Sequence, residues 1–105
     1  MALLHFDQKS FDAALAEGKL MMVDFWANWC MPCRMLGPVI EQLAQDYEGK
    51  AVIGKVDVDE EQELAIRYGV MSIPTVIFFK DGKEIDRKVG VQPAGVYTQT
   101  LDANL

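Results

Sequence analysis

Cysteine and histidine are scarce in this sequence, which has two cysteines and one histidine among 105 residues. A structural zinc site usually needs about four Cys, His or carboxylate ligands at suitable spacing. The sequence offers one cysteine pair, no second pair and only His5. Basic residues are also few, since 10 Lys and Arg compare with 16 Asp and Glu for a formal net charge of -6. This charge argues against nucleic acid or an anionic membrane surface as a partner, because both attract basic patches.

Long apolar runs and targeting signals are missing as well. No apolar stretch approaches the ~18 residues of a membrane-spanning helix, and residues 1–7 lack the basic, apolar and cleavage-site pattern of a signal peptide. We therefore expect no membrane segment, a cytoplasmic location and protein partners. The length is typical of one domain and 50% of the residues are hydrophobic. We expect a single domain over residues 1–105, acting as a monomer.

The two cysteines lie close together, in the segment Trp29-Cys30-Met31-Pro32-Cys33. Residues at this spacing share a helix face with Cβ atoms about 5–6 Å apart, and a distorted first turn brings them towards the roughly 3.5–4.5 Å of a disulfide. The chain-entropy gain from so small a ring is only about 2 kcal/mol, against about 3 kcal/mol for a fifteen-residue loop. The pair therefore suits reversible exchange better than reinforcement. The alternatives are half of a zinc site, two inert core thiols and a static structural disulfide.

Hydrophobic patterns predict strands and helices that alternate along the chain, in the order βαβαβαββα. The run from Leu20 to Ala27 is almost continuously apolar, which is typical of a central strand covered on both faces. This order predicts an α/β fold with a mixed sheet and helices on both faces. The predicted strands are 3–6, 20–27, 51–58, 75–79 and 84–89, and the predicted helices follow Asp7, begin near Cys33, follow Asp59 and begin near Pro93.

Three short signals refine this pattern. Asp81-Gly82 between two apolar runs is a strong β-hairpin signal. Pro38 falls inside the long predicted helix and should kink it, because proline lacks the N–H and collides with the preceding turn. Asp59 with Gln62 three residues later resembles a capping box at the start of the short third helix.

The cysteine pair needs a local field that favours the thiolate, because an ordinary thiol with a pKa near 8.5 is only about 3% ionised at pH 7. A helix N-terminus provides that field if Cys30 is the N-cap and its sulfur faces free backbone N–H groups, notably that of Cys33. Pro32 in the first turn lacks an N–H without breaking the helix. Cys30 at the tip should then attack a substrate, and Cys33, one turn inward, should resolve the mixed disulfide.

Asp24 is the candidate proton acceptor for Cys33, because it is the only ionisable residue in the apolar run from Leu20 to Ala27. Lys55, on the following strand, is its candidate partner. On periodicity alone, Asp24 can equally lie at the sheet rim and Lys55 can be a solvated strand residue. We expect Trp26 in the core and Trp29 half-exposed on a contact surface.

These residues occur in the order and spacing of a known family, and nearly the whole chain resembles the thioredoxins. The matching segments are Val23-Asp24-Phe25-Trp26-Ala27, Trp29-Cys30, Pro32-Cys33, Pro38, Lys55-Val56-Asp57, Tyr68-Gly69-Val70, Ile73-Pro74-Thr75, Val89-Gly90 and Leu101-Asp102-Ala103-Asn104-Leu105.

The resemblance implies a thioredoxin fold, with a central five-stranded mixed sheet flanked by four helices. It implies a dithiol–disulfide oxidoreductase that reduces protein disulfides, binds no cofactor or metal itself, and receives electrons from NADPH through a thioredoxin reductase. It also implies that Cys30 is nucleophilic, Cys33 resolves and Asp24 is a buried acid–base group near Cys33. Pro74 should be cis and face the disulfide, beside an apolar docking groove around Trp29, Ile73, Pro74, Gly90 and Val91.

Three departures from the family pattern bear on this expectation. Met31 occupies the position where glycine is usual, and it adds a bulky apolar group to the docking surface beside Pro32. Met71 and Ser72 replace residues that are more often charged and glycine, and Pro93 replaces a polar cap. A higher redox potential caused by Met31 would favour an oxidase or isomerase, since about 30 mV corresponds to about 1.4 kcal/mol. A thioredoxin-like binding module with idle thiols is the alternative from another functional class.

Overall fold

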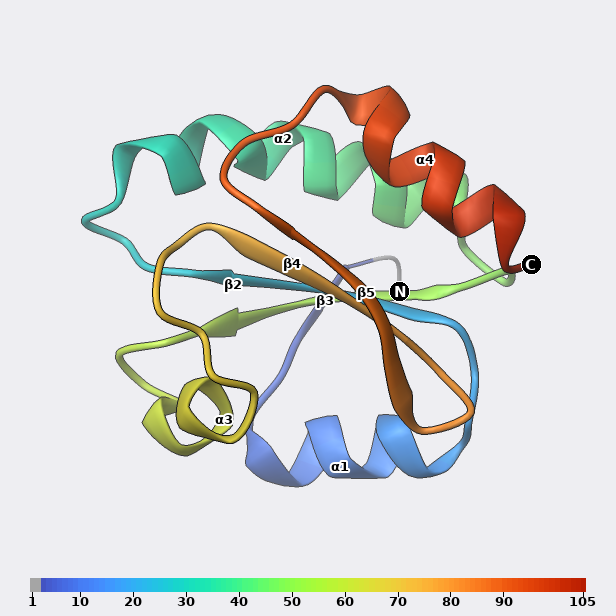
Figure 1. Cartoon of the computed structure of the whole chain (residues 1–105), viewed down its shortest axis with the longest axis horizontal. Coiled ribbons are helices and arrows are strands. Elements are labelled where there is room, and N and C mark those ends of the chain that lie inside the picture. The colour runs from blue at the N-terminus through green and yellow to red at the C-terminus, as the bar shows by residue number, and fades with distance from the viewer. Residues whose placement is uncertain (1–2) are drawn as a thin grey trace.

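A five-stranded mixed sheet in the order β1-β3-β2-β4-β5 forms the centre of the structure (Figure 1). The computed structural model describes residues 3–105 of the chain. The strands are β1 Leu3–His5, β2 Met21–Trp26, β3 Val52–Asp57, β4 Thr75–Lys80 and β5 Lys83–Val89, and the helices are α1 Gln8–Ala16, α2 Met31–Asp46, α3 Gln62–Arg67 and α4 Ala94–Ala103. The predicted element order and the five-strand, four-helix fold are confirmed.

Strand β4 runs opposite to the other four strands of the sheet. Strand β3 pairs in parallel with β1 and β2, whereas β4 pairs antiparallel with both β2 and β5. Parallel neighbours need a crossover connection, which α1 and α2 provide between β1, β2 and β3. The carboxyl ends of β2 and β3 therefore lie at one edge of the sheet, where α2 and α3 begin.

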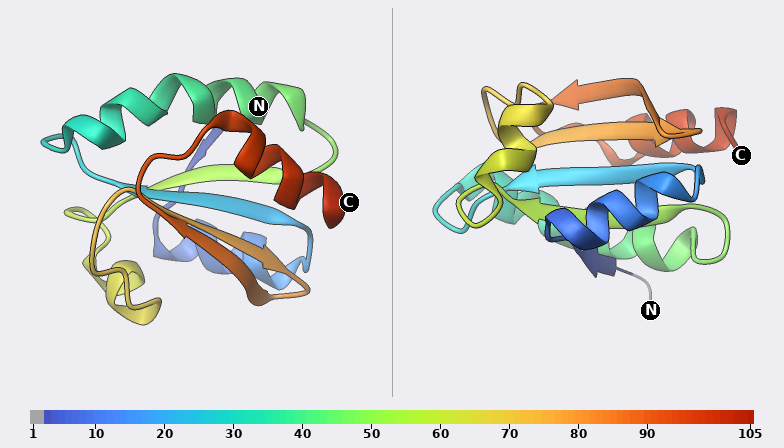
Figure 2. Two further views of the ribbon diagram at one scale, coloured as in Figure 1. Left: turned by 45° about the horizontal axis from the view of Figure 1, so that its top comes forward. Right: turned by 90° about the horizontal axis from the view of Figure 1, so that it is seen from below.

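Helices cover both faces of the sheet, α2 and α4 one face and α1 and α3 the other (Figures 1 and 2). Successive side chains of β2 point to opposite faces of the sheet, as in any β-strand. Met22 joins the core under α2 and α4, while Met21 and Val23 join the core over α1 and α3. Residues 21–25 are all buried, so the predicted central strand with two covered faces is confirmed.

The long helix α2 is amphipathic. Its buried residues are Cys33, Leu36, Ile40, Leu43 and Ala44, all on the side that meets the sheet. Pro38 lies inside α2 on the exposed side, and the helix continues to Asp46; the kink at Pro38 stays a prediction. Within residues 3–105, no helix has both the length and the apolar composition needed to cross a bilayer.

One of the three local signals is confirmed, the Pro38 kink stays a prediction, and the third is wrong. Asp81 and Gly82 have φ of 56° and 77° and form the hairpin turn between β4 and β5. The capping box predicted from Asp59 and Gln62 is absent: α3 begins after Glu61 with no side-chain cap. The Asp59 carboxylate accepts the Nε1–H of Trp29 instead, and Asp57 accepts the N–H groups of Asp59 and Glu60 ahead of the helix.

Candidate redox site

A disulfide joins Cys30 and Cys33 at the start of α2, with the two Cα atoms 5.2 Å apart. Cys30 is the N-cap of the helix in an extended backbone conformation, with φ of -92° and ψ of 107°. Pro32 lies in the first turn, where a missing N–H removes no helical hydrogen bond. The predicted position of the pair at a helix N-terminus is confirmed.

The two sulfur atoms of the pair have different surroundings. The backbone N–H of Cys33 donates to Cys30 Sγ over 3.2 Å, so the helix end directs a donor at that sulfur. Cys30 keeps 5% of its surface exposed, whereas Cys33 keeps 0%. Cys33 packs with Ala27 beneath the first turn, against Trp26, Val58 and Ile73. Only Cys30 therefore has any surface that an approaching molecule can meet.

A loop distant in sequence meets the disulfide, and a second distant loop is hydrogen-bonded to the first. Cys30 Sγ lies 3.8 Å from the carbonyl oxygen of Ile73, and the bond from Ile73 to Pro74 is cis. The N–H of Gly90 donates to the carbonyl of Pro74 over 2.8 Å. Gly90 has φ of 82°, which side-chain-bearing residues rarely adopt, so glycine suits this close approach. The loops before β4 and after β5 are thus joined beside the redox pair.

Apolar side chains surround this junction at the protein surface. Trp29 is 70% exposed, Met31 66% and Val91 46%, so Trp29 is more exposed than the half-exposure predicted from sequence. Trp29 is oriented by its Nε1, which donates to Asp59 Oδ2 over 2.8 Å. Exposed apolar groups of this size beside a reactive pair are typical of a binding surface.

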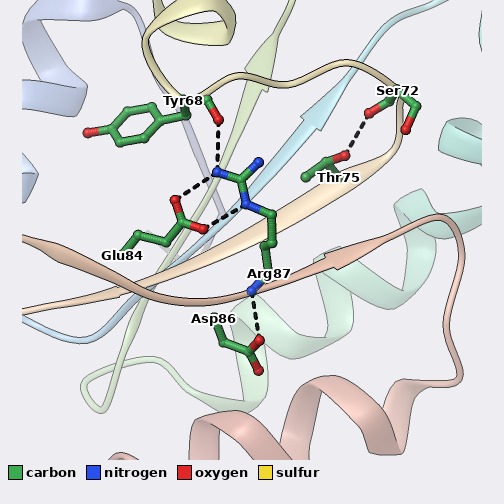
Figure 3. Close-up of polar contacts among 6 residues, drawn as sticks. All are labelled: Tyr68, Ser72, Thr75, Glu84, Asp86 and Arg87. Carbon is green, nitrogen blue, oxygen red and sulfur yellow. Dashed lines mark hydrogen bonds and ion pairs between the residues drawn. The ribbon is translucent and has the colours of Figure 1, made fainter.

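The loop that carries Ile73 and Pro74 is anchored at two points (Figure 3). Near its end, Thr75 Oγ1 donates to the carbonyl of Ser72 over 2.6 Å. At its start, Arg87 Nη2 on β5 donates to the carbonyl of Tyr68 over 2.8 Å. Glu84 holds the same guanidinium with two contacts of 2.7 Å (Figure 3). These anchors tie the loop to the sheet and keep the Ile73 carbonyl against Cys30.

Asp24 is fully buried in the middle of β2, so the alternative position at the sheet rim is wrong. Within residues 3–105, no hydrogen-bond donor reaches either of its carboxyl oxygens. Burial raises the pKa of Asp24 from 3.8 to about 7, and the positive charge of Lys55 opposes that rise. Its carboxyl group can therefore exchange a proton near neutral pH.

Lys55 is the register partner of Asp24 on the neighbouring parallel strand. It is half-buried, and its Nζ lies 3.9 Å from the centre of the Trp26 ring. Cation–π contact of this kind holds the ammonium group in place. Trp26 is accordingly half-buried between the core and Lys55 rather than wholly inside the core.

Asp24 and Cys33 lie on the same side of the sheet. Asp24 alternates with Val23 and shares the strand face of Met22, which packs in the core beneath α2 and α4. Cys33 is the buried residue in the first turn of α2. Sequence reasoning missed Asp59 and Arg87, because their contacts with Trp29 and Tyr68 span 30 and 19 residues and leave no local signal.

Metal-ligating side chains do not gather near this site or elsewhere in the described chain. Among residues 3–105, no three His, Cys, Asp or Glu side chains lie close enough to hold an ion. Both cysteines are already joined to each other. The reactive groups that the structure does show here are the sulfur pair and, on the same side of the sheet, the buried carboxyl group of Asp24.

Comparisons with known proteins agree with this geometry. The family model described as Thioredoxin matches residues 2–103. Thioredoxins of Staphylococcus aureus strains Mu50 and MW2 are 50% identical over 105 residues, which is 100% of both chains. A mutant thioredoxin from Halobacterium salinarum NRC-1 superposes with a TM-score of 0.90 at 36% identity, covering 97% of this chain and 89% of that one. This chain belongs to the thioredoxin family, and with its cysteine pair it is a dithiol–disulfide oxidoreductase that reduces protein disulfides.

Proposed function

We propose that Cys30 attacks substrate disulfides and that Cys33 resolves the resulting mixed disulfide. The observation that carries this assignment is the asymmetry of the pair: Cys30 is the N-cap with an exposed edge, and Cys33 is fully buried. An attacking sulfur must meet its substrate, whereas a resolving sulfur needs to reach only its neighbour. Burial and helix position thus favour Cys30 as the attacking sulfur and Cys33 as the resolving sulfur.

In the first step, the Cys30 thiolate attacks one sulfur of the substrate disulfide. A bond forms between Cys30 and that sulfur, and the second substrate sulfur leaves as a thiolate that takes up a proton. The N–H of Cys33, 3.2 Å from Cys30 Sγ, and the positive end of the α2 dipole favour negative charge on Cys30.

In the second step, Cys33 gives its proton to Asp24 and attacks Cys30 Sγ. The Cys30–Cys33 disulfide forms, the bond between Cys30 and the first substrate sulfur breaks, and that sulfur leaves as a thiolate that takes up the proton released by Asp24. Counting the proton that Cys30 lost when it ionised, the dithiol has given up two electrons and two protons, and the substrate has gained the same number. Asp24 suits the acceptor role because its pKa of about 7 lets it take and release a proton near neutral pH. Lys55 assists by moderating that pKa.

The substrate chain docks on the apolar surface around the disulfide. This docking surface comprises Trp29, Met31, Pro32, Ile73, Pro74, Gly90 and Val91. Trp26 and Pro38 support it structurally, Trp26 through its contact with Lys55 and Pro38 within α2. Burial of apolar surface on docking supplies affinity that depends little on the substrate's sequence.

A thioredoxin reductase reduces the Cys30–Cys33 disulfide of the oxidised protein with electrons from NADPH. The proposal is of a monomeric electron carrier that acts in the cytoplasm and itself holds no cofactor. Family membership and the arrangement of the site support this proposal.

Reduction of a disulfide-bonded protein such as insulin, with NADPH and a thioredoxin reductase, tests the function. NADPH consumption that requires both this chain and the substrate is expected. If chemically reduced protein acts on insulin while the NADPH-coupled assay is silent, the reductase assignment is wrong. Strong oxidation of a target dithiol by the purified protein in glutathione buffers would favour an oxidase instead.

The division of roles is tested with Cys33→Ser, which should accumulate covalent complexes with substrates through Cys30. Cys30→Ser is the matched control and should accumulate none. Equal trapping by both variants, or none by Cys33→Ser, would reverse or remove the assignment.

A further inference from the structure

The methionines among residues 3–105 fall into two groups with opposite exposure. Met21 and Met22 in β2 are 0% exposed, whereas Met31, Met35 and Met71 are 66%, 71% and 95% exposed. A large apolar side chain that remains in water at these fractions is open to whatever approaches the surface. We call the three exposed residues the methionine rim.

The methionine rim borders the redox pair. Met31 follows Cys30 as the first residue of α2, and Met35 lies one turn further along the same face. Met71 precedes Ile73, whose carbonyl oxygen lies 3.8 Å from Cys30 Sγ. Two residues of chain span at most about 7 Å, so Met71 approaches the site from the loop opposite α2. The rim thus flanks the disulfide from two elements.

The thioether sulfur is the chemically reactive feature that these three side chains share. A hydroperoxide transfers one oxygen atom to the sulfur, which is oxidised to the sulfoxide, while the peroxide is reduced to water or an alcohol. The reaction needs access to the sulfur, which the rim has and Met21 and Met22 lack. In the oxidised protein, Cys30 and Cys33 are joined and offer no thiolate to compete.

Met31 lies in the docking surface, Met35 follows it by one helical turn and Met71 lies two residues before Ile73, so a sulfoxide on the rim changes the surface that a protein substrate meets. It replaces a flexible apolar side chain with a polar one, and burial of an unpaired polar group on docking is unfavourable. A small disulfide that touches only Cys30 needs none of this surface. Oxidation of the rim should therefore weaken the reaction with protein substrates selectively.

We propose that Met31, Met35 and Met71 form a peroxide-modified site that lowers the affinity of this oxidoreductase for protein substrates while leaving its dithiol chemistry intact. The inference rests on the proposed docking of substrates at this face. It assigns the departures from the family pattern at Met31 and Met71 a shared consequence, namely sensitivity of the docking surface to hydroperoxides.

The test treats the disulfide form with hydrogen peroxide, maps the added oxygen by peptide mass spectrometry, reduces the cysteines with dithiothreitol and measures kinetics. The three rim residues should carry oxygen while Met21 and Met22 do not. KM for insulin should rise about fivefold to tenfold with kcat little changed, a tenfold rise being about 1.4 kcal/mol. The rate with a small aromatic disulfide should stay within about twofold.

The variant Met31→Leu, Met35→Leu, Met71→Leu is the matched control, because leucine keeps the volume and apolar character without the thioether. Its KM for insulin should be the same before and after treatment, whatever its untreated value. An equal loss in this variant, an unchanged KM in rim-oxidised wild type, or equally rapid oxidation of Met21 and Met22 would overturn the inference. If untreated protein fails to reduce insulin, the proposed function itself is wrong and the inference falls with it.

Discussion

Asp24→Asn should make the oxidised protein more stable at alkaline pH and leave it almost unchanged in acid. The carboxyl group is fully buried, and its pKa is raised from 3.8 to about 7 by that burial. Between pH 3.8 and about pH 7, Asp24 is therefore protonated in the folded state but ionised in the unfolded chain. Asparagine has nearly the same shape and never ionises, so it removes the dependence without opening a cavity.

The sign and size of the effect follow from proton linkage. Where the folded state binds more protons than the unfolded state, the free energy of unfolding falls as pH rises. The stability of the wild-type protein begins to fall above about pH 3.8, and the loss is complete above about pH 7. At 1.36 kcal/mol for each pKa unit, the rise corresponds to about 4 kcal/mol in the wild-type protein. The variant should gain that amount at about pH 8 and little at about pH 4.

Urea unfolding followed by far-ultraviolet circular dichroism, at both pH values and with the disulfide intact, measures this difference. The dependence of free energy on urea concentration should match between the two proteins, which confirms that the unfolded states are comparable. Asp81→Asn makes the same chemical change in an exposed turn and should give one stability difference at both pH values. A gain for Asp24→Asn that is equal in acid and alkali would refute the reasoning.

Two further predictions concern Lys55 and the glycines. Lys55→Met should raise the pKa of Asp24 above about 7, because the lysine charge lowers it. NMR titration of the Asp24 carboxyl group measures this pKa, and an unchanged or lower value in the variant would contradict the prediction. A Cβ on Gly54 would overlap the Phe6 ring, so Gly54→Ala should cost about 1–3 kcal/mol in thermal or urea unfolding. In helix α4, Gly95 has nothing within 4 Å of such a Cβ, and Gly95→Ala should stabilise by up to about 1 kcal/mol. Equal effects at the two glycines would show that the steric argument is wrong.

Much of the fold was predictable because its signals are local. The apolar run that forms β2 can only be buried on both faces, and Asp81-Gly82 permits the two positive φ values of a tight hairpin. The helix N-terminus at Cys30 follows from the proline two residues later and the apolar spacing beyond it. Each of these features depends on residues near one another in sequence.

The remaining features of the site depend on contacts across the fold. Asp59 was assigned to a helix cap on its spacing to Gln62, but its side chain reaches Trp29, 30 residues away. The anchor between Arg87 and Tyr68 joins β5 to a loop that no pattern connects with it. The cis bond before Pro74 was expected only from the family resemblance, since the base rate for such bonds is about 5–6%.

Alkylation of the reduced protein tests the central claim most directly. At neutral pH, a limiting amount of iodoacetamide should modify Cys30 and spare Cys33, because only the helix-tip sulfur has both an exposed edge and an N–H directed at it. Peptide mapping after a short exposure would report the ratio of the two products. Predominant modification of Cys30 is the result that the account predicts. Equal labelling of the two cysteines, or faster labelling of Cys33, would contradict it.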